Sequence, residues 1–152
     1  MKDEPERPLT LGWREWVGLP QLGIQRIKAK VDTGARTSAL HAFEVEPFKE
    51  HGRQRLRFKM HPLQRDPDTV VECFADVRDS RTVTDSGGHR EQRWVIESLL
   101  EVGDRAWPIE ITLTSREDML FRMLLGRTAM AGRATVNPSQ SYLQGKRRKA
   151  RA

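Results

Sequence analysis

The sequence predicts an all-β domain, folded as a barrel or a sandwich, with one short helix near its C-terminal end. Apolar and polar residues alternate along several segments, and turn-forming residues separate these segments. Alternation with a period of two gives each strand one apolar face that can turn toward a core. The only convincing helical pattern is short, at residues 127–131. A chain of 152 residues suits a single domain, which we expect at residues 9–143.

The predicted strands follow one another with turns between them. In chain order, the first alternating groups are Phe43, Val45 and Phe48; Leu56, Phe58 and Met60; and Val71, Cys73, Ala75 and Val77. His51-Gly52 predicts the turn between the first two groups. The polar segment 85–88 predicts a turn before the next strand. Gly103-Asp104 separates two apolar segments, 99–102 and 107–113, and predicts a hairpin.

Most of the excess positive charge lies at the C-terminal end. The chain has 27 Lys and Arg residues against 21 Asp and Glu, with a pI near 10.0. Five of the basic residues occur at 146–152, so 22 basic residues face 21 acidic ones in the rest of the chain. We expect residues 144–152 to form a disordered basic tail and residues 1–8 a disordered N-terminus, because neither can bury much apolar surface. The tail either contacts nucleic acid or an acidic partner weakly, or only adds solubility.

The sequence excludes several classes of protein. No apolar segment approaches the ~20 residues of a membrane-spanning helix, and residues 1–20 lack the apolar centre of a signal peptide. Cys73 is the one cysteine, which excludes an internal disulfide and a thiolate metal site. We therefore expect a cytoplasmic protein without membrane contact. Because Cys73 lies in an alternating strand, we expect a buried thiol rather than a nucleophile.

We also expect no metal site and no cofactor. The four histidines are scattered without the spacing of zinc ligands: His41, His51, His61 and His89. Neither His-Glu-x-x-His nor the phosphate-binding Gly-x4-Gly-Lys-Ser/Thr motif occurs. His41 follows the Asp32 loop and could line a site there, but we expect it to pack in the fold or to lie on its surface. The four tryptophans are not spaced as a stacking platform, so we expect them to pack in the core and at the ends of the domain: Trp13, Trp16, Trp94 and Trp107.

The segment most informative about chemistry joins an apolar strand to an Asp-Thr-Gly loop. Residues 27–31 alternate, and Asp32-Thr33-Gly34-Ala35 follows at once. Asp-Thr-Gly alone is a common turn. A second apolar segment, 123–125, is followed by Gly126-Arg127. Together the two segments resemble the pepsin-like and retroviral aspartic proteases, in which an apolar-Gly-Arg segment packs beneath the active-site loop.

Four segments make the chain resemble one bacterial family in particular, because they occur in the same order along the sequence. They are residues 32–41, 93–97, 113–119 and 124–127, and the similarity extends over residues 13–143. They are similar to the retropepsin-like family labelled ATP-dependent zinc proteases, or RimB-like, which is associated with ATP-grasp ligases that append glutamates to proteins. The resemblance implies a closed six-stranded acid-protease barrel with one short C-terminal helix. It also implies an aspartic-type peptidase that hydrolyses peptide bonds in glutamate-rich tails added by such a ligase.

The resemblance assigns the catalytic chemistry to Asp32, Thr33 and Gly34. In an aspartic protease two carboxylates share a proton, because both cannot be ionised when they lie a few Å apart. One acts as general base on a water while the other donates a hydrogen bond to the scissile carbonyl. Thr33 would brace the loop by hydrogen bonding, and Gly34 would allow close approach. We expect a second copy of the chain to supply the second carboxylate in a homodimer. Asp85-Ser86-Gly87 lacks an apolar strand before it and predicts a turn instead.

Ala35, Arg36 and Arg127 are the candidate substrate-binding residues. In the retroviral enzymes an aspartate follows Asp-Thr-Gly-Ala and pairs with the arginine of the Gly-Arg segment, whereas this chain has Arg36 there. Arg36 and Arg127 therefore need anionic partners if they lie close together. These are either nearby carboxylates, such as Glu117 or Asp118, or an acidic substrate held in a bidentate arginine contact. Arg36 is the better candidate for the substrate.

Two other functions are compatible with the sequence. The fold could be a non-catalytic peptide-binding module that acts with a ligase or a ribosomal partner, or the chain could associate with RNA through its tail. The nearly neutral body and the lack of aromatic–basic interleaving argue against specific RNA recognition. The flap over the site is either the hairpin at residues 51–52 or the turn at residues 86–89, because a glycine-containing tip fits both.

Overall fold

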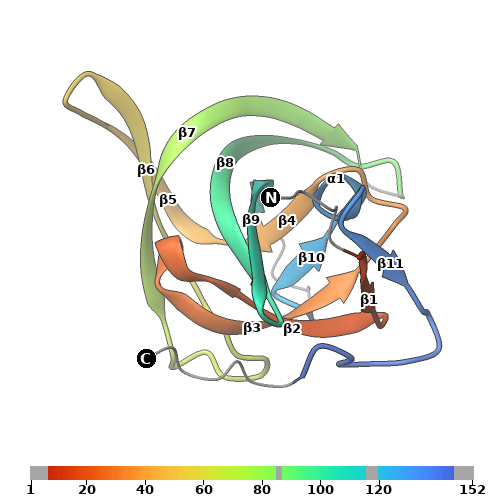
Figure 1. Cartoon of the computed structure of the whole chain (residues 1–152). Helices are drawn as coiled ribbons and strands as arrows, with labels where there is room; N and C mark the ends of the chain where they lie inside the picture. The colour runs from red at the N-terminus through yellow and green to blue at the C-terminus, as the bar shows by residue number, and fades with distance from the viewer. Residues whose placement is uncertain (1–6, 85–86, 116–119, 146–152) are drawn as a thin grey trace, which may run out of the picture.

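The fold is built almost entirely from strands (Figure 1). The structure is a computed structural model that describes residues 7–84, 87–115 and 120–145. Its elements in chain order are β1 (Leu9–Leu11), β2 (Arg14–Leu19), the 3₁₀ helix η1 (Pro20–Leu22), β3 (Ile24–Val31), β4 (Ser38–His41), β5 (Phe43–Glu50), β6 (Arg53–Met60), β7 (Val71–Thr84), β8 (Arg90–Val102), β9 (Arg105–Thr114), β10 (Met123–Leu125), α1 (Arg127–Met130) and β11 (Ala134–Val136). The predicted all-β class, with a short helix near the C-terminal end, is confirmed. Among the described residues, no helix has the length and apolar character needed to cross a membrane.

Nine strands form one sheet, and its pairing brings two distant strands together. The order is β2-β3-β10-β4-β9-β8-β7-β6-β5. Strand β2 also pairs with β8, where Gly18 lies opposite Glu101, so the first six strands of this order are joined at both ends. Strands β1 and β11 form a separate parallel pair. Figure 1 shows β7 and β8 curving around the other strands, while the hairpin of β5 and β6 projects outward.

The predicted hairpins are present at the expected positions. Strands β5 and β6 pair around His51-Gly52, whose φ angles of 52° and 77° lie in the left-handed region. Strands β8 and β9 pair on either side of Gly103-Asp104. Strand β7 pairs with two different strands along its length. Its residues 71–76 pair with β6, and its residues 77–84 pair with β8. The predicted turn at residues 85–88 lies between β7 and β8, with its first two residues outside the described ranges.

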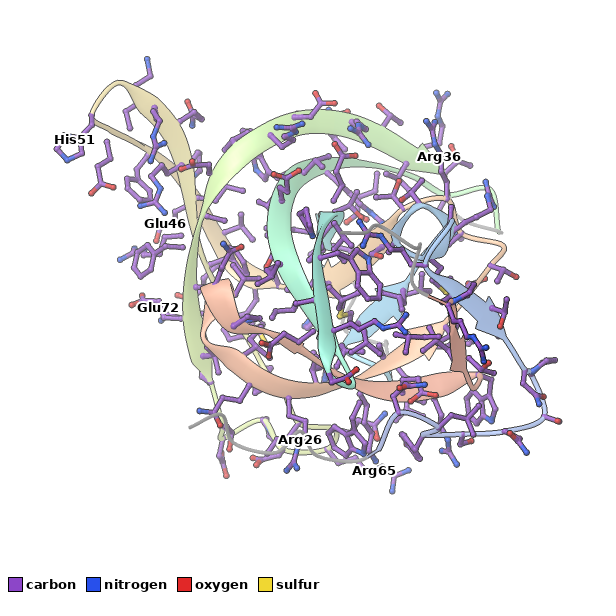
Figure 2. The ribbon with its side chains drawn as sticks, viewed as in Figure 1. Arg26, Arg36, Glu46, His51, Arg65 and Glu72 are labelled. Carbon is purple, nitrogen blue, oxygen red and sulfur yellow. The ribbon has the colours of Figure 1, made fainter. Side chains whose placement is uncertain are left out.

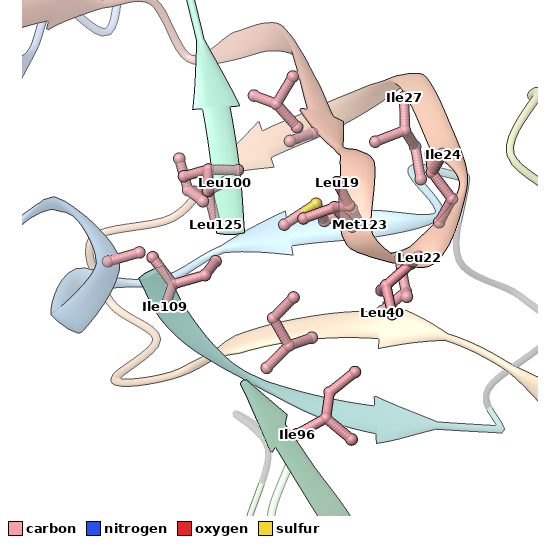
Figure 3. Packing of buried hydrophobic residues seen from close by; sticks show 14 of the residues in the cluster. Leu19, Leu22, Ile24, Ile27, Leu40, Ile96, Leu100, Ile109, Met123 and Leu125 are labelled. Atoms are coloured by element: carbon pink, nitrogen blue, oxygen red, sulfur yellow. The ribbon is translucent and has the colours of Figure 1, made fainter. Parts of the chain in front are cut away.

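Alternation along the strands builds one apolar core (Figure 3). Its large, fully buried side chains include Leu19, Ile24, Ile27, Leu40, Ile96, Leu100 and Met123. Cys73 belongs to the same cluster, with 1% of its surface exposed. Burial, with a smaller contribution from the charge of Glu72, raises the pKa of the Cys73 thiol to about 12. The prediction of a buried thiol is confirmed, since a thiol with this pKa stays protonated at neutral pH.

The tryptophans divide between the core and the outer surface. Trp107 lies in the core, and the half-buried Trp94 packs against the core cluster. Trp13 and Trp16 are half-buried outside this cluster, and the Trp16 ring stacks on Tyr142. Trp16 lies outside the core because β2 turns its other set of alternating residues, Glu15 and Val17, inward.

A buried carboxylate fastens the segment after β11 to the body. Glu15 is fully buried, with 0% of its surface exposed. Its Oε2 accepts hydrogen bonds from the backbone N–H groups of Gly12 at 2.6 Å and Leu143 at 2.9 Å. Its Oε1 accepts one from the N–H of Gln144 at 3.0 Å. One side chain thus accepts three hydrogen bonds, two of which join the start of the described chain to its end.

The hydrogen bonds of Glu15 extend to Gln144, one residue beyond the predicted domain. Gln144 belongs to the predicted tail, yet its side-chain amide also donates to the carbonyl of Thr10 at 2.9 Å. Near the other end, the carbonyl of Arg7 accepts a hydrogen bond from Arg105. The remaining predicted disordered residues, 1–6 and 146–152, lie outside the described ranges.

Replacement of Glu15 by alanine is expected to lower the free energy of unfolding by about 3 kcal/mol, because it leaves buried N–H groups without an acceptor. Urea unfolding monitored by tryptophan fluorescence measures this change. The exposed Glu72→Ala is the control, with an expected change within about 0.5 kcal/mol. Equal unfolding midpoints for the two variants would contradict the stabilising role of Glu15.

Candidate active site

Strand β3 delivers Asp32 at its C-terminal end, as the sequence predicts. Ala29 and Val31 of β3 are buried, and they lie opposite Met123 and Leu125 of the parallel strand β10. The pairing continues one step beyond the strand, since the N–H of Asp32 donates to the carbonyl of Leu125 at 2.9 Å. Asp32 is therefore positioned by backbone hydrogen bonds of a central part of the sheet.

The Asp32 side chain is held by its own loop. Its Oδ1 accepts a hydrogen bond from the N–H of Gly34 at 2.9 Å, and its carbonyl accepts one from the N–H of Ala35 at 3.2 Å. A Cβ at Gly34 would lie 3.1 Å from Oδ1, so a larger residue would crowd the carboxylate. Asp32 is half-buried, whereas Thr33 and Gly34 are exposed. The carboxylate is accessible and oriented, and the loop presents Thr33-Gly34 to the outside.

Helix α1 and the Arg127 side chain clamp the other side of this loop. The N–H of Arg127 donates to the carbonyl of Ala35 at 2.7 Å, and the N–H of Thr128 donates to the carbonyl of Arg36 at 2.9 Å. The Arg127 guanidinium donates through Nη1 to the carbonyl of Thr33 at 2.9 Å. Arg127 therefore positions the loop. The sequence predicted that Thr33 braces the loop by hydrogen bonding. In the structure, the backbone carbonyl of Thr33 accepts the hydrogen bond from Arg127.

The backbone of Gly126 lies so close to Thr37 and Ser38 that no side chain would fit at this position. A Cβ on Gly126 would lie 2.5 Å from the carbonyl carbon of Thr37 and 2.8 Å from the N atom of Ser38. The buried N–H of Gly126 donates to the Ser38 hydroxyl oxygen at 3.0 Å. The predicted packing of the Gly126-Arg127 segment against the Asp32 loop is present.

Arg36 is exposed on the rim of the molecule (Figure 2). Within residues 7–84, 87–115 and 120–145, no carboxylate forms an ion pair with its guanidinium. The partners that the sequence suggests, Glu117 and Asp118, lie outside the described residues. Arg36 and Arg127 have different environments, since the guanidinium of Arg127 is used on the loop backbone.

The two flap candidates differ in their position. Figure 2 shows His51 and Arg36 at opposite sides of the molecule, so the β5–β6 hairpin of the same chain does not cover the Asp32 loop. The other candidate is the turn between β7 and β8. Its Gly87, Gly88 and His89 are exposed, and Ser86 lies outside the described residues. The assignment of the turn between β7 and β8 as the flap stays a prediction.

A chain of buried polar groups, which sequence reasoning missed, connects the start of β8 to the Asp32 loop. The Arg93 guanidinium donates to Glu91 at 2.7 Å and to the Thr112 hydroxyl at 3.3 Å. Thr112 donates to the carbonyl of Ser38 at 3.1 Å. Ser38 is fully buried, and Arg93 is 9% exposed. Arg93 and Thr112 lie outside the alternating apolar sets of β8 and β9, so the alternation in the sequence did not point to them.

The Glu91 carboxyl stays ionised in this arrangement. Burial by itself would raise its pKa, but hydrogen bonds from Arg93 and Thr114, together with the positive charge of Arg93, hold the pKa below its ordinary value. A carboxyl with a lowered pKa stabilises the fold above its ordinary pKa, and this contribution disappears as the pH falls through the lowered value. The connection between β8 and β9 is therefore weakened only in acid.

Metal-binding residues do not gather in the described part of the chain. No group of three or more His, Cys, Asp or Glu side chains there could hold a metal ion. His41, which follows the loop, is buried at the end of β4 with 2% of its surface exposed. Of the environments considered for His41, packing inside the fold is the one present.

An Asp-Thr-Gly loop at the end of a strand, with a Gly-Arg segment packed against it, defines a retropepsin-like protein. A family model described as "RimB-like: Retropepsin-like aspartic endopeptidase RimB" matches residues 10–147. The chain belongs to this RimB-like family. The resemblance identified from the sequence is confirmed.

Curated relatives carry a different name. The chain is 43% identical over 142 residues to a "Probable alpha-L-glutamate ligase" of Shewanella pealeana. It is 45% identical over 139 residues to a protein of the same name from Parasynechococcus marenigrum. The matches cover 93% and 91% of this chain but 31% and 30% of the relatives. The chain thus spans about a third of the length of the curated relatives it matches.

A solved structure shares the fold. The crystal structure of a protein of unknown function from Legionella pneumophila matches with a TM-score of 0.78. The match covers 91% of this chain and 99% of that one, at 24% sequence identity.

Replacement of Ser38 by alanine is expected to lower the free energy of unfolding by about 1–3 kcal/mol, because the buried Gly126 N–H loses its acceptor. Amide hydrogen exchange at Gly126 should accelerate in the same variant. The control is Ser98→Ala, a similarly buried serine whose hydroxyl donates to the carbonyl of Leu99. If Gly126 exchanged at the same rate in both variants, the Ser38 hydroxyl would not be what holds this segment.

Proposed function

We propose that this chain is an aspartic-type peptidase that hydrolyses peptide bonds in acidic, glutamate-rich tails. The observation that carries the proposal is the Asp32 carboxylate, held by the Gly34 N–H in a loop that β10 and α1 fasten from below. An accessible carboxylate in a rigid loop can act as a general base with little reorganisation. Membership of the RimB-like family supports the same chemistry.

The proposed mechanism needs a second carboxylate, which we assign to Asp32 of a second copy. A two-fold axis beside the exposed Thr33-Gly34 would bring the two Asp32 loops together. The two carboxylates would share one proton, since both cannot be ionised at close distance. The ionised one takes a proton from water as the water oxygen attacks the scissile carbonyl carbon, and the protonated one donates a hydrogen bond to the carbonyl oxygen. Proton transfer to the amide nitrogen then releases the amine product.

We also infer that β2, β3, β10, β4, β9 and β8 act as a closed six-stranded acid-protease barrel. The pairing of Gly18 with Glu101 supports this inference, because it joins the two ends of the strand order. Closure removes free sheet edges and makes the base of the Asp32 loop stiffer.

The substrate class follows from the relatives and from Arg36. Relatives named glutamate ligase contain a region similar to this chain in about a third of their length. We infer that the chain acts on the product of glutamate ligation or beside an ATP-grasp ligase. The exposed Arg36 supports this choice, since a guanidinium binds carboxylates in a bidentate contact. Ala35 and Arg127 complete the predicted contact residues, although the Arg127 guanidinium is already bonded to Thr33.

The second candidate function is a peptide-binding module without hydrolysis, acting with a ligase or a ribosomal partner. One observation favours it: in the part of the chain that the structure describes, no second carboxylate is hydrogen-bonded to Asp32. A cytoplasmic location and a weak contact of the basic tail with nucleic acid stay predictions of the sequence.

Replacement of Asp32 by asparagine is expected to lower kcat/KM for a peptide ending in a run of glutamates by about 10³-fold or more, because the general base is lost. Mass spectrometry of the cleaved peptide measures both rates. Asp104→Asn, on the β8–β9 turn, is the matched control and should retain wild-type activity. Equal cleavage by wild type and Asp32→Asn would remove Asp32 from the mechanism.

The same preparations test the dimer. Sedimentation velocity should show a concentration-dependent dimer of the wild-type chain, with activity that rises faster than protein concentration. A strict monomer that still cleaves the peptide would contradict the shared pair of Asp32 residues. A strict monomer that binds the peptide without cleaving it would support the peptide-binding module.

Reversal of the charge at Arg36 is expected to raise KM for the glutamate-tailed peptide by about tenfold, because an attraction becomes a repulsion. Cleavage of a neutral peptide should change much less. Lys49→Glu, an exposed charge reversal on the distant β5 strand, provides the control. Unchanged kinetics of Arg36→Glu on the acidic peptide would exclude a substrate contact by Arg36.

A further inference from the structure

Aromatic and basic side chains gather on the outer face of β2 and β3, away from the core. We call this surface the aromatic–basic face. It consists of Trp13, Arg14, Trp16, Arg26, Lys28, Lys30 and Tyr142. Except for the exposed Lys30, these residues are half-buried. In Figure 2, Arg26 lies at the lower edge of the molecule and Arg36 near its upper right. Arg26 therefore lies far from Arg36, while Lys30, two residues before Asp32, lies at the end of the face nearest the loop.

Strand register explains why these residues meet. Arg14 lies opposite Lys30, and Trp16 lies opposite Lys28, so all four project from the outer side of the two strands. Tyr142 is added by the segment after β11, where its N–H donates to the carbonyl of Arg14 at 2.9 Å. The buried Glu15 fastens the residues that follow Tyr142.

The cations are held in place by aromatic rings. The Arg14 guanidinium carbon lies 4.5 Å from the ring centroid of Trp13 and 5.0 Å from that of Tyr142. Lys28 Nζ lies 5.2 Å from the Trp16 centroid, and the Arg26 guanidinium lies 4.9 Å from the same ring. Such contacts reduce the freedom of long side chains. Arg14 Nε also donates to the Ser141 hydroxyl oxygen at 3.1 Å, and Lys28 Nζ donates to the side-chain oxygen of Gln64 at 3.4 Å, so the partners of both cations are neutral groups.

Carboxylates do not neutralise most of this face. In the described part of the chain, Arg14, Lys28 and Lys30 form no ion pair with Asp or Glu. The β5–β6 hairpin differs sharply, because its basic residues lie beside acidic ones: Arg55 with Glu50, Arg57 with Glu46, and Lys59 with Glu44. Arg14, Lys28 and Lys30 thus keep positive charge that no carboxylate of the described residues neutralises.

The arrangement of the rings favours carboxylates over nucleic-acid bases as the ligand. A base binds by stacking on a free aromatic face. Here Trp16 and Tyr142 stack on each other, with ring centroids 6.2 Å apart, and cations lie over both rings. A base would have to displace these contacts, whereas a row of carboxylates can bind the outward N–H groups directly.

We propose that the aromatic–basic face is a second binding surface that holds an acidic peptide segment while another part of the same chain occupies the Asp32 loop. The inference rests on the proposed function for its substrate class and adds a site to it. Two linked contacts raise the effective concentration of the tail at the loop. Long glutamate tails would therefore bind more tightly than short ones.

Binding is tested in the Asp32→Asn background, so that no hydrolysis is needed for the readout. Fluorescence anisotropy with a labelled glutamate run measures affinity for a variant of the face, Arg14→Gln with Lys28→Gln and Lys30→Gln. We expect binding about tenfold weaker at low salt and little difference at high salt. The control, Lys49→Gln with Arg53→Gln and Arg57→Gln, removes the same charge from the β5–β6 hairpin and should change affinity less than about twofold. The single variant Lys30→Glu, at an exposed position, provides a second test with little risk to folding.

Three results would overturn the proposal. Equal affinity of the face variant and the hairpin variant would show a general charge effect only. Unchanged binding by Lys30→Glu would show that the peptide does not bind at the exposed end of the face, nearest the Asp32 loop. Tighter binding of single-stranded oligouridylate than of the glutamate run, lost in the face variant, would make nucleic acid the ligand. Binding that depends on the face, in a chain that cleaves nothing, would support this surface and refute the proposed peptidase.

Discussion

The candidate site depends on the position of β10 between β3 and β4. This short strand pairs parallel to β3 and antiparallel to β4, so the same residues hold both ends of the Asp32 loop. Gly126 extends the contact, since its N–H reaches Ser38 and its missing side chain leaves room for Thr37. The geometry of Asp32 is therefore set mainly by backbone groups. The Arg127 guanidinium adds a side-chain contact, since it donates a hydrogen bond to the carbonyl of Thr33.

Local patterns predicted the elements of this arrangement better than the contacts between them. Alternation located β5, β6 and β7 correctly, because the direction of a side chain on a strand depends only on its immediate neighbours. The placement of residues 123–127 against residues 32–37 depends on pairing between distant segments, which alternation does not encode. There the family resemblance supplied the expectation. The bond from Arg127 to the Thr33 carbonyl could not be predicted from residue types, since its acceptor is a backbone group.

The distribution of charge was the least predictable feature. Counting residues assigns nearly all the excess charge to the tail and leaves a neutral body, yet a neutral sum does not require a neutral surface. The β5–β6 hairpin pairs its charges, whereas β2 and β3 place Arg14, Lys28 and Lys30 side by side. Tyr142 lies far from Trp16 in the sequence, so their stacking required the folded chain. The spacing of the tryptophans therefore carried no information about this contact.

The backbone contacts that hold the Asp32 loop explain why a basic residue is tolerated at position 36. In the retroviral arrangement an aspartate at this place pairs with the arginine of the Gly-Arg segment and so fastens the loop. Here the Arg127 guanidinium bonds the Thr33 carbonyl, and α1 bonds the carbonyls of Ala35 and Arg36 through backbone N–H groups. The loop is fastened without a carboxylate, which frees the side chain at position 36 from a structural role. Replacing an acidic side chain by Arg36 reverses the charge in the active-site loop itself. An arginine at this place attracts carboxylates, which is what the proposed glutamate-tailed substrate requires.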